Sequence, residues 1–384
     1  MDQIINSFDQ VYIDHDAVTS DVAKRFLSIF SKEKIKIVSE RPYPEVQGSL
    51  SAREFDRSKR VLFLTPFQGQ FFKQCPGFKP GLVCCNYFVL NLGLQCNMNC
   101  SYCYLQSYLN TPVTTIYSNI NEALSQLDVI AKKHSSEPYR VGTGETVDSL
   151  SLDGLTLYSR QLISFFNNYP KWELELKTKS NTVDQFLDLE HVGNTVISWS
   201  LNPQHIISHE EHGTASLEER FMAAEKCLNK NFKVNFHLDP VVWHPNWQEN
   251  YFELVDQITK RFSAKDIPHI SLGALRFQPE QRHIMRERFG MKSYVTSSEV
   301  LLSSDGKLRY DLRLRNEMFT AIVNRFKSHS ADWNVIMCME TPETWLAHQG
   351  VNPRSNENLN PYFRPLPKPL KGEQKISHHT HNPS

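Results

Sequence analysis

Six apolar segments alternate with helical patterns from residue 87 onward, and this alternation constrains the fold more than any other feature of the 384-residue chain. Between most of the segments, apolar residues recur at helical spacing. Ser216 and Glu219 match the capping box that opens a helix, here one that runs through Lys230. The series predicts an α/β fold with a parallel sheet and helices outside it, in an open or partial (β/α)6 barrel. The predicted strands are residues 87–92, 139–141, 172–178, 195–201, 233–238 and 269–275.

The chain before this barrel predicts a small α/β domain over residues 1–80. Ser20 is suited to cap a helix whose apolar residues fall on one face. The segment from Ser39 to Lys59, with its prolines and mixed charges, predicts a connecting loop. The strands predicted in this domain are residues 11–13, 35–38 and 61–64.

The chain after the barrel, which spans residues 85–295, predicts a smaller C-terminal extension. Asp305-Gly306 lies between two apolar segments, which is a signal for a β-hairpin. The hairpin and further helices occupy residues 296–364 of the predicted organisation. Residues 365–384 are polar and rich in proline, so they predict a disordered tail.

Composition limits the partners and the cellular compartment that we expect for the chain. Hydrophobic residues make up 40% of it, which is enough for a sizeable core, and the formal net charge is zero. A neutral chain has no global attraction to nucleic acid, so binding of a polyanion must be local. The polar first residues argue against a secretory signal, and no apolar run reaches the length of about 18 residues that a membrane span needs. We expect a cytoplasmic protein that contacts no membrane and keeps its eight cysteines reduced.

Three cysteines lie close together at the end of the first predicted strand region. Cys96, Cys100 and Cys103 have the spacing C-x3-C-x2-C, which lets three thiolates converge on one metal centre from a single loop. A structural zinc site normally has four protein ligands, and no further pair follows at finger-like spacing. The incomplete set favours an iron-sulfur cluster with one open iron. A zinc loop and three unrelated buried cysteines are the alternatives.

This cysteine motif, with an aromatic residue before its last cysteine, resembles the signature of radical S-adenosylmethionine (SAM) enzymes. The resemblance implies a 4Fe-4S cluster in which three thiolates bind three irons and SAM chelates the fourth. Reduction of such a cluster cleaves the sulfonium of SAM and releases a 5'-deoxyadenosyl radical. It also implies that the barrel is of the radical SAM type, in which the protein positions and shields the cofactor.

Polar residues follow several of the predicted strands, where parallel barrels collect their functional groups. Gly142-Thr-Gly144-Glu145 matches the family's Gly-Gly-Glu element, which receives the methionyl amino group of SAM. Lys177 is placed to pair with the SAM carboxylate, and Ser200 and Asn202 suit the ribose hydroxyls. A turn that only reverses the chain and lysines that are merely solvated are the alternatives.

Several stretches taken together narrow the resemblance to the spore photoproduct lyase family over roughly residues 10 to 350. It implies repair of 5-thyminyl-5,6-dihydrothymine in ultraviolet-damaged DNA: hydrogen abstraction from C6, β-scission of the bond between the bases, return of a hydrogen atom to thymine, and regeneration of SAM. Tyr102 and Tyr104 would relay the hydrogen atom, with ordinary aromatic packing as the alternative. The stretches are Tyr102-Cys-Tyr-Leu-Gln106, Leu176-Lys-Thr-Lys179, His237-Leu-Asp-Pro240, Ser271-Leu-Gly273 with Arg276, Asp305-Gly-Lys-Leu-Arg-Tyr310, and Cys338-Met-Glu340 with Trp345.

One departure from this family concerns the hydrogen donor. The family places a cysteine after the second barrel strand, whereas Gly144-Glu-Thr-Val-Asp148 contains none. Cys75, Cys84 or Cys85 is a candidate replacement, with buried core thiols as the alternative. The departure also favours a related radical SAM enzyme that acts on a different substrate. A non-catalytic iron-sulfur or zinc protein that binds nucleic acid is the second alternative.

Partners follow from the same resemblance. The hairpin's second arm is basic, and basic residues on such a hairpin can contact phosphates and help to extrude a damaged base. We expect contacts with DNA from Arg276, Lys307, Arg309 and Tyr310, although a cluster of cations balanced by nearby glutamates is commonly just a solvated surface. Reduction of the cluster implies an electron donor such as flavodoxin or ferredoxin.

Overall fold

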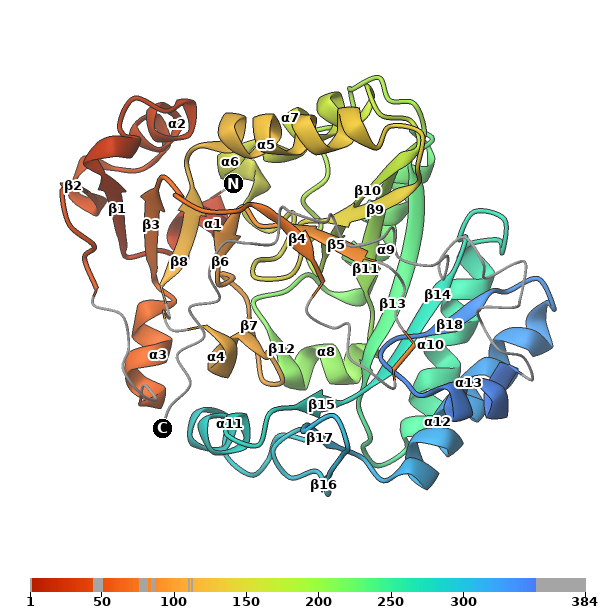
Figure 1. Cartoon of the computed structure of the whole chain (residues 1–384). Coiled ribbons are helices and arrows are strands. Elements are labelled where there is room, and N and C mark those ends of the chain that lie inside the picture. Colours follow the sequence, from red (N-terminus) through yellow and green to blue (C-terminus); the bar gives the residue numbers. More distant parts are fainter. Residues whose placement is uncertain are drawn as a thin grey trace.

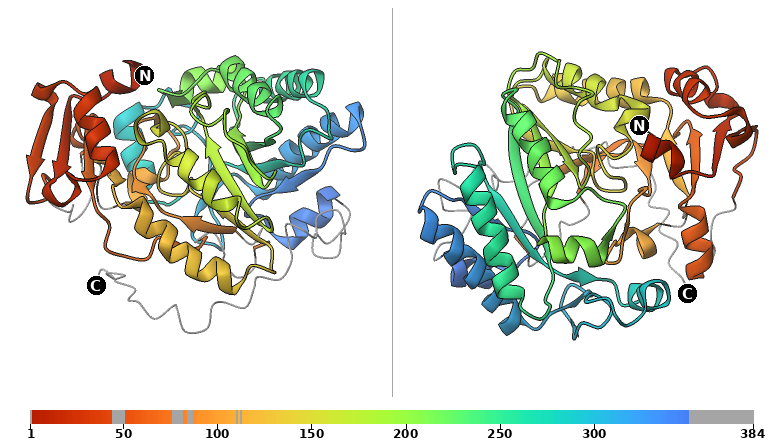
Figure 2. Two further views of the ribbon diagram at one scale, coloured as in Figure 1. Left: turned by 90° about the horizontal axis from the view of Figure 1, so that it is seen from above. Right: turned by 180° about the vertical axis from the view of Figure 1, so that it is seen from behind.

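The computed structural model describes residues 2–43, 51–75, 82–83, 87–109, 111 and 113–349. The two largest sheets organise this part of the chain: one contains the strands predicted for the barrel, and a smaller one lies beside it (Figure 1). The small sheet and the helices α12 (Leu312–His329) and α13 (Pro342–Gln349) lie at opposite ends of the molecule (Figure 2).

The large sheet contains the six predicted barrel strands in the predicted series. Its order is β18-β14-β13-β11-β10-β9-β5-β4, and every pairing is parallel except that of β4 with β5. The sequence missed β4 and β18, because three residues are too short to show a period. The strands are β4 (Phe72–Gln74), β5 (Tyr87–Leu90), β9 (Tyr139–Gly142), β10 (Trp172–Thr178), β11 (Thr195–Ser200), β13 (Lys233–Val241), β14 (Ile270–Ala274) and β18 (Val335–Met337).

Helices cover the outer side of this sheet. The capping box at Ser216 is present, with both of its hydrogen bonds to and from Glu219, and it opens α9. Helices alternate with strands along the chain, as the β/α series predicts. They include α5 (Ile120–Lys133), α6 (Asp153–Thr156), α7 (Tyr158–Phe166), α9 (Leu217–Leu228) and α10 (Trp247–Arg261).

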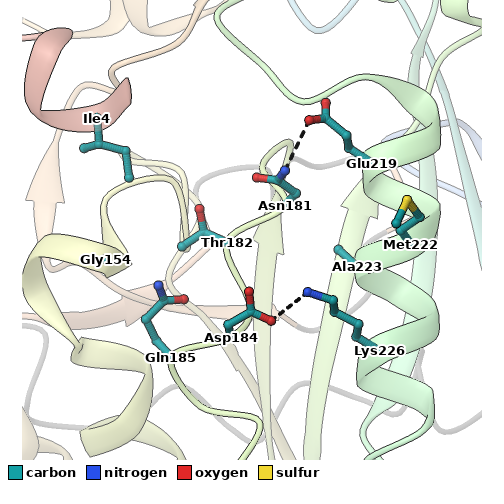
Figure 3. Close-up of a pocket in the computed structure, with 10 residues that line it drawn as sticks. All are labelled: Ile4, Gly154, Asn181, Thr182, Asp184, Gln185, Glu219, Met222, Ala223 and Lys226. Atoms are coloured by element: carbon teal, nitrogen blue, oxygen red, sulfur yellow. Dashed lines mark hydrogen bonds and ion pairs between the residues drawn. The ribbon is translucent and has the colours of Figure 1, made fainter. Parts of the chain in front are cut away.

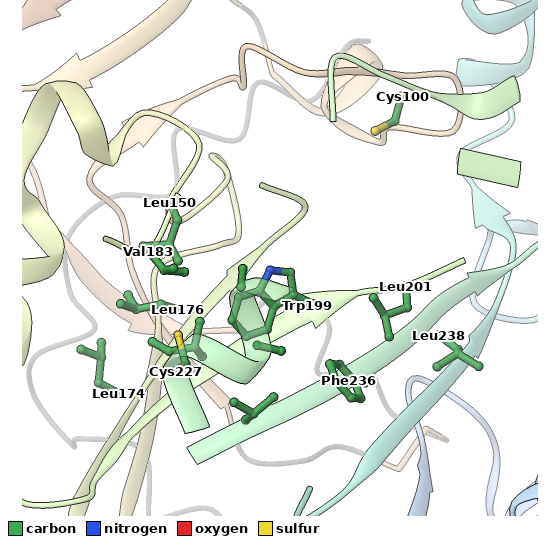
Figure 4. Close-up of a cluster of buried hydrophobic side chains, with 14 of the residues drawn as sticks. Cys100, Leu150, Leu174, Leu176, Val183, Trp199, Leu201, Cys227, Phe236 and Leu238 are labelled. Carbon is green, nitrogen blue, oxygen red and sulfur yellow. The ribbon is translucent and has the colours of Figure 1, made fainter. Parts of the chain in front are cut away.

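Alternate residues of the barrel strands differ in character. Leu176 and Phe236 belong to the core between strands and helices, and Figure 4 shows Leu176 near Cys227 of α9. Glu175 lies between apolar neighbours on β10 and reaches His237 of β13 on the other face. Parallel sheets usually bury apolar residues on both faces. The interior of this barrel is therefore unusually polar.

The small sheet draws on more of the chain than the predicted domain of residues 1–80. Its order is β2-β1-β3-β8-β6, and β6 and β8 flank the cysteine loop in sequence. The loop thus leaves this sheet at Leu94 and the chain returns to it at Thr114. Both ends of the loop are anchored as a result. The strands are β1 (Gln10–Asp14), β2 (Ile35–Val38), β3 (Val61–Thr65), β6 (Gly93–Leu94) and β8 (Thr114–Tyr117).

The expected loop between Ser39 and Lys59 is wrong in its second half. Residues 52–58 form helix α3 (Ala52–Ser58), opened by a capping box between Ser51 and Glu54. The Ser51 hydroxyl accepts from the Glu54 N–H, and the Glu54 carboxylate accepts from the Ser51 N–H. The same motif that predicted α9 was present here, but prolines nearby made the segment look irregular. Residues 44–50 of this loop lie outside the described residues.

The other predicted helix and hairpin are confirmed. Ser20 caps α2 (Asp21–Ile29) through the N–H of Ala23, and Gly306 has the positive φ, +80°, that the hairpin turn requires. The hairpin strands pair with a third one that follows β14, and the predicted tail lies outside the described residues. In the described part of the chain, no helix is both long and apolar enough to cross a membrane. The remaining elements named below are β7 (Asn99–Cys100), α4 (Leu105–Tyr108), α8 (Gln204–Glu210), β12 (Glu211–His212), β15 (Arg276–Phe277), α11 (Gln281–Phe289), β16 (Leu301–Leu302) and β17 (Leu308–Arg309), with α1 (Asp2–Asn6) at the start.

Candidate active site

The cysteine loop gathers three thiols at the edge of the barrel. Cys96 and Cys100 are buried, and Cys103 is half-buried. Burial raises the pKa of the Cys96 thiol to about 11 and raises that of Cys100 as well, and the nearby charge of Cys103 adds to both increases. Within the described ranges, no three histidine, cysteine or acidic side chains converge on a single ion. A cluster spreads its three thiolates over three irons, so this set of thiols fits it better than a lone zinc ion.

Lys59, at the end of α3, fixes the start of this loop. Its buried ammonium donates to the carbonyl oxygens of Cys96 at 2.6 Å and Met98 at 2.5 Å. Arg288 of α11 is also turned inward, where it contacts the side chain of Asn99 and pairs with Asp56 of α3 at 2.5 Å. The loop is therefore fixed through its backbone and through Asn99, which leaves the thiols available as ligands.

Two glutamines fix the end of the same loop. Gln106 donates to the carbonyl of Ser101 at 2.8 Å, and Gln281 of α11 donates to that of Cys103 at 2.9 Å. In the middle, Cys100 in β7 pairs with Glu211 in β12. No pattern in the sequence pointed to Gln281, which is 178 residues away from Cys103 in the chain.

Tyr102 belongs to a buried charged network beneath the loop. Its hydroxyl donates to Glu211 at 2.5 Å, and Arg220 of α9 pairs with the same carboxylate at 2.6 Å. Burial opposes ionisation of Glu211, but the charges of Arg220 and Lys179 outweigh it and lower the pKa. Both atoms of the Asn202 amide are engaged as well, with Glu211 at 2.9 Å and with the Tyr251 hydroxyl at 2.8 Å. The network thus ties Tyr102 and Asn202 to the fold.

Tyr104 instead reaches the Gly-rich turn after β9. The residue is 42% exposed, and its hydroxyl donates to the carbonyl of Glu145. The Glu145 carboxylate pairs with Lys73 of β4 at 3.1 Å. The structure therefore brings together Tyr104 and the turn, two features that the sequence predicted separately.

The glycines of that turn have different surroundings. A Cβ at Gly142 would lie 1.5 Å from the Tyr87 hydroxyl, so close packing alone requires glycine there. A Cβ at Gly144 would lie 3.1 Å from the Ser149 hydroxyl, which is tight but less severe. Ser200, predicted with this site, is buried at the end of β11, and its carbonyl accepts from Arg220 at 2.8 Å.

A polar cluster lies inside the barrel that the sequence analysis did not identify. Glu175 accepts from the Ser198 hydroxyl at 2.5 Å and lies 2.9 Å from Nε2 of His237. Burial opposes the charge on Glu175, but His237 and Arg140 outweigh it and lower the pKa. The available signal was the alternation of charged and apolar residues along β10, with Lys177 two residues after Glu175.

An ion pair lies near the end of β13, the strand that also carries His237 of this cluster. Arg276 donates to both oxygens of Asp239, at 2.9 and 3.0 Å. The charge of Lys177 lowers the pKa of both Asp239 and His237. The sulfur of Cys338 lies 3.8 Å from the Arg276 guanidinium.

The residues expected to contact DNA are more buried than side chains on a basic, projecting hairpin would be. Arg309 is 3% exposed and pairs with Asp305 at 2.5 Å and Glu340 at 3.4 Å. Tyr310 is also buried, and its hydroxyl accepts from the backbone N–H of Trp243 at 3.0 Å. The two carboxylates draw the Arg309 side chain inward, and the contact with Trp243 holds Tyr310 in the core. Arg276 and Lys307 are half-buried, and the exposed apolar residues of the hairpin are Leu301 and Leu302.

Cys75 is the one candidate hydrogen donor whose position the structure describes. It follows β4, and its N–H donates to the carbonyl of Tyr87 at 2.9 Å. Its thiol lies near enough to Tyr104 and Tyr108 to contribute to the raised pKa of each. Cys84 and Cys85 lie outside the described residues.

A pocket of ≈ 410 Å³ lies elsewhere on the molecule, between α1, α6, α9 and the segment after β10 (Figure 3). Two pairs cross it, Asn181 with Glu219 at 3.4 Å and Lys226 with Asp184 at 2.8 Å. None of the site residues predicted from the sequence lines this pocket.

Comparisons with known proteins agree with the geometry. The family model for spore photoproduct lyase matches residues 7–303. A spore photoproduct lyase of Geobacillus sp. (strain Y412MC61) is 24% identical over 282 residues, which are 73% of this chain and 82% of the relative. That of Bacillus subtilis (strain 168) is 32% identical over 183 residues, 47% of this chain and 53% of the relative.

Solved structures agree on the fold. A mutant spore photoproduct lyase with bound AdoMet and dinucleoside spore photoproduct superimposes with a TM-score of 0.74 at 23% identity, over 85% of this chain and 98% of that one. Another structure, of spore photoproduct lyase with dinucleoside spore photoproduct, gives a TM-score of 0.73 at 23% identity with the same coverage. These findings confirm the resemblance seen in the sequence: the chain belongs to the spore photoproduct lyase family.

Proposed function

We propose that this enzyme is a radical SAM lyase that reverses the thymine spore photoproduct in ultraviolet-damaged DNA. The observation that carries the proposal is the contact between Tyr104, directly after the third cysteine, and Glu145 in the turn after β9. That contact joins the cysteine loop to the end of a barrel strand, where parallel barrels hold their substrates. Family membership and the relatives that bind AdoMet and the dinucleoside photoproduct support the same function.

Cys96, Cys100 and Cys103 would hold three irons of a 4Fe-4S cluster. When bound and reduced, such a cluster would supply the electron for cleavage of the sulfonium of SAM. The chain's own contribution is positioning and exclusion of water. Lys59, Gln106 and Gln281 hold the loop by its carbonyl groups, which leaves the thiols available to bind iron.

The polar residues around the loop suit the remaining parts of SAM. The turn at Glu145 offers a carboxylate and carbonyl groups to an amino group, and Lys177 offers an ammonium to a carboxylate. Ser200 is buried at the end of β11 and suits a ribose hydroxyl, whereas Asn202 would have to share an amide already bonded to Glu211 and Tyr251. Tyr104 is exposed and contacts the turn at Glu145, whereas Tyr102 is buried against Glu211, so Tyr104 is the better placed of the two tyrosines for a hydrogen relay.

A second candidate function is radical SAM chemistry of the same kind on a different substrate. The observation that favours it is the segment 144–148, which lacks the cysteine that the family uses as hydrogen donor. Cys75 lies near Tyr104 and is our preferred replacement donor. With such a donor present, the photoproduct remains the favoured substrate.

The proposal also covers the contacts with DNA, the cellular compartment and the electron donor. Arg276 and Lys307, both half-buried beside the ends of the barrel strands, are the cations that we expect to meet the DNA backbone. We place the reaction in the cytoplasm, where thiols stay reduced and a one-electron donor such as flavodoxin or ferredoxin is available.

Product analysis by mass spectrometry tests the proposal. The protein is reconstituted anaerobically with iron and sulfide and then given dithionite, SAM and an oligonucleotide that carries the photoproduct. We expect intact thymines and little net loss of SAM. A variant with Cys96, Cys100 and Cys103 all changed to Ala should produce neither thymine nor 5'-deoxyadenosine. Cleavage of SAM without repair would discard the photoproduct as substrate and favour the second candidate.

A further inference from the structure

The cysteine loop is covered on its outer side by two helices, α3 and α11. They pack against each other and lie on the far side of the loop from the barrel strands (Figure 1). Lys59, directly after α3, contacts the carbonyl of Cys96, and Gln281, at the start of α11, contacts that of Cys103. These two helices are therefore the layer between the three thiols and solvent on this side.

The two helices and their flanks carry an excess of positive charge. Residues 51–60 and 280–292 contain eight lysines and arginines against four acidic residues, although the whole chain has 42 of each. Two of these cations are neutralised, Arg288 by Asp56 and Arg60 by Asp9, each at 2.5 Å. The excess of positive charge therefore belongs to this surface and not to the chain as a whole.

Several of the remaining cations face solvent. Arg53, Arg57, Arg286 and Lys292 are exposed, and none of them pairs with a carboxylate of the residues that the structure describes. Arg282 is half-buried beside them. We call the surface formed by these five residues the α3–α11 face.

We propose that the α3–α11 face is the docking site for a small acidic protein that delivers single electrons to the cluster. The inference rests on the proposed function, because a cluster that cleaves SAM must first be reduced. One electron passes from the reduced carrier to the cluster, and no proton or bond is transferred. Opposite charges on the two proteins would speed their encounter and orient the carrier's cofactor toward the loop.

DNA would also be attracted by positive charge, but the position of this face favours the electron carrier. The cysteine loop separates the face from the barrel interior, so a lesion in DNA bound here would lie on the wrong side of the thiols. An electron carrier has the opposite requirement, since it must approach the cluster without blocking the substrate. Glu54 and Glu287 also lie on these helices, Glu280 directly precedes α11, and the three carboxylates would repel a continuous phosphate backbone.

The test compares two double variants of the reconstituted enzyme with the same change in charge. Arg53→Glu with Arg57→Glu alters the face, whereas Lys260→Glu with Lys265→Glu alters exposed positions at the end of α10 and just after it. Reduction of the cluster by fully reduced flavodoxin is followed by stopped-flow absorbance at several salt concentrations. We expect the first variant to lose about tenfold in rate at low salt and most of the salt dependence, and the control to stay within about twofold.

Further readouts separate the outcomes. Arg286→Glu, on the other helix, should slow the reaction in the same direction, which local misfolding of α3 would not explain. Reduction by dithionite, and SAM cleavage with dithionite, should be unchanged in every variant. Equal rates with flavodoxin in the variants and the control would overturn the docking site alone. Loss of oligonucleotide affinity with unchanged flavodoxin rates would assign the face to nucleic acid instead, and a protein that takes up no 4Fe-4S cluster would overturn both proposals.

Discussion

Glu211 and Arg220 form an ion pair in which neither side chain is exposed to solvent, with the two nearest atoms 2.6 Å apart. Tyr102 donates to the same carboxylate at 2.5 Å. Because Glu211 lies in β12, which pairs with Cys100 in β7, this pair connects the cysteine loop to helix α9. The loop is thus held by a buried charge as well as by hydrogen bonds to its backbone.

Glu211→Gln should destabilise the protein by about 3–5 kcal/mol, because it leaves the Arg220 guanidinium buried without an opposite charge. Denaturant unfolding of the reconstituted enzyme measures the change. Asp184→Asn is the matched control. It breaks an exposed ion pair, in which the side chain of Asp184 is 67% exposed and that of Lys226 is 50% exposed. That loss should stay below about 1 kcal/mol. Equal losses in the two variants would contradict the role given to the buried pair.

Lys59→Met should lower the iron and sulfide bound per chain after reconstitution. Methionine keeps most of the aliphatic stem but removes the two hydrogen bonds to the carbonyls of Cys96 and Met98, which leaves those groups without their buried donor. Far-UV circular dichroism should stay unchanged, which shows that the fold is intact. Lys24→Met, on the exposed side of α2, is the control and should bind iron normally. Equal iron content in the two variants would show that the loop needs no support from Lys59.

The sequence predicted the framework of this protein well, because long strands and helices reveal themselves by periodicity. Strand β10 was predicted with its observed bounds, and the capping box at Ser216 marked the true start of α9. Helix α3 was missed although Ser51 and Glu54 form the same motif, since the nearby prolines outweighed a signal only four residues long. Local patterns thus located the elements that are long enough to repeat.

The site was predictable only where it is local in sequence. The three cysteines share one loop, and family resemblance added the turn at Glu145. The partners that support them are distant in the chain: Gln281 lies 178 residues from Cys103, and Glu211 lies 109 residues from Tyr102. No spacing rule connects such residues. The burial of Arg309 could not be predicted from the sequence either, because it depends on Glu340, which follows β18.

Acid should weaken the contribution of Asp239 to stability. Burial alone would raise the pKa of this carboxyl, but Arg276 and Lys177 lower it below its ordinary value. A lowered pKa gives stability that is fully present above about pH 4 and is lost as the pH falls through the folded pKa. The stability difference between the wild type and Asp239→Asn should therefore shrink below pH 4. Chemical unfolding from pH 7 to pH 2.5 measures it, and a difference that stays constant would contradict the ion pair with Arg276.

The two tyrosines of the loop should behave differently when each loses its hydroxyl. Tyr102→Phe removes a donor from the buried Glu211 carboxylate and should cost about 1–3 kcal/mol of stability. Tyr104→Phe alters a side chain that is 42% exposed, so stability should change by less than about 0.5 kcal/mol. It should instead lower the yield of thymine per SAM consumed, if Tyr104 relays the hydrogen atom. Identical yields in Tyr104→Phe and the wild type would remove Tyr104 from the relay.

Cys75→Ala should uncouple cleavage of SAM from clean formation of thymine. Its thiol is close enough to Tyr104 and Tyr108 to contribute to the raised pKa of each. The turn at residues 144–148 offers no cysteine of its own. Without a donor, the thymine radical should be trapped as abnormal products, while 5'-deoxyadenosine still forms with dithionite. Cys227→Ala removes a thiol buried in α9 and should leave the products unchanged. Normal products from Cys75→Ala would move the role to Cys84 or Cys85, and normal products from all three single variants would show that none of these thiols is the donor.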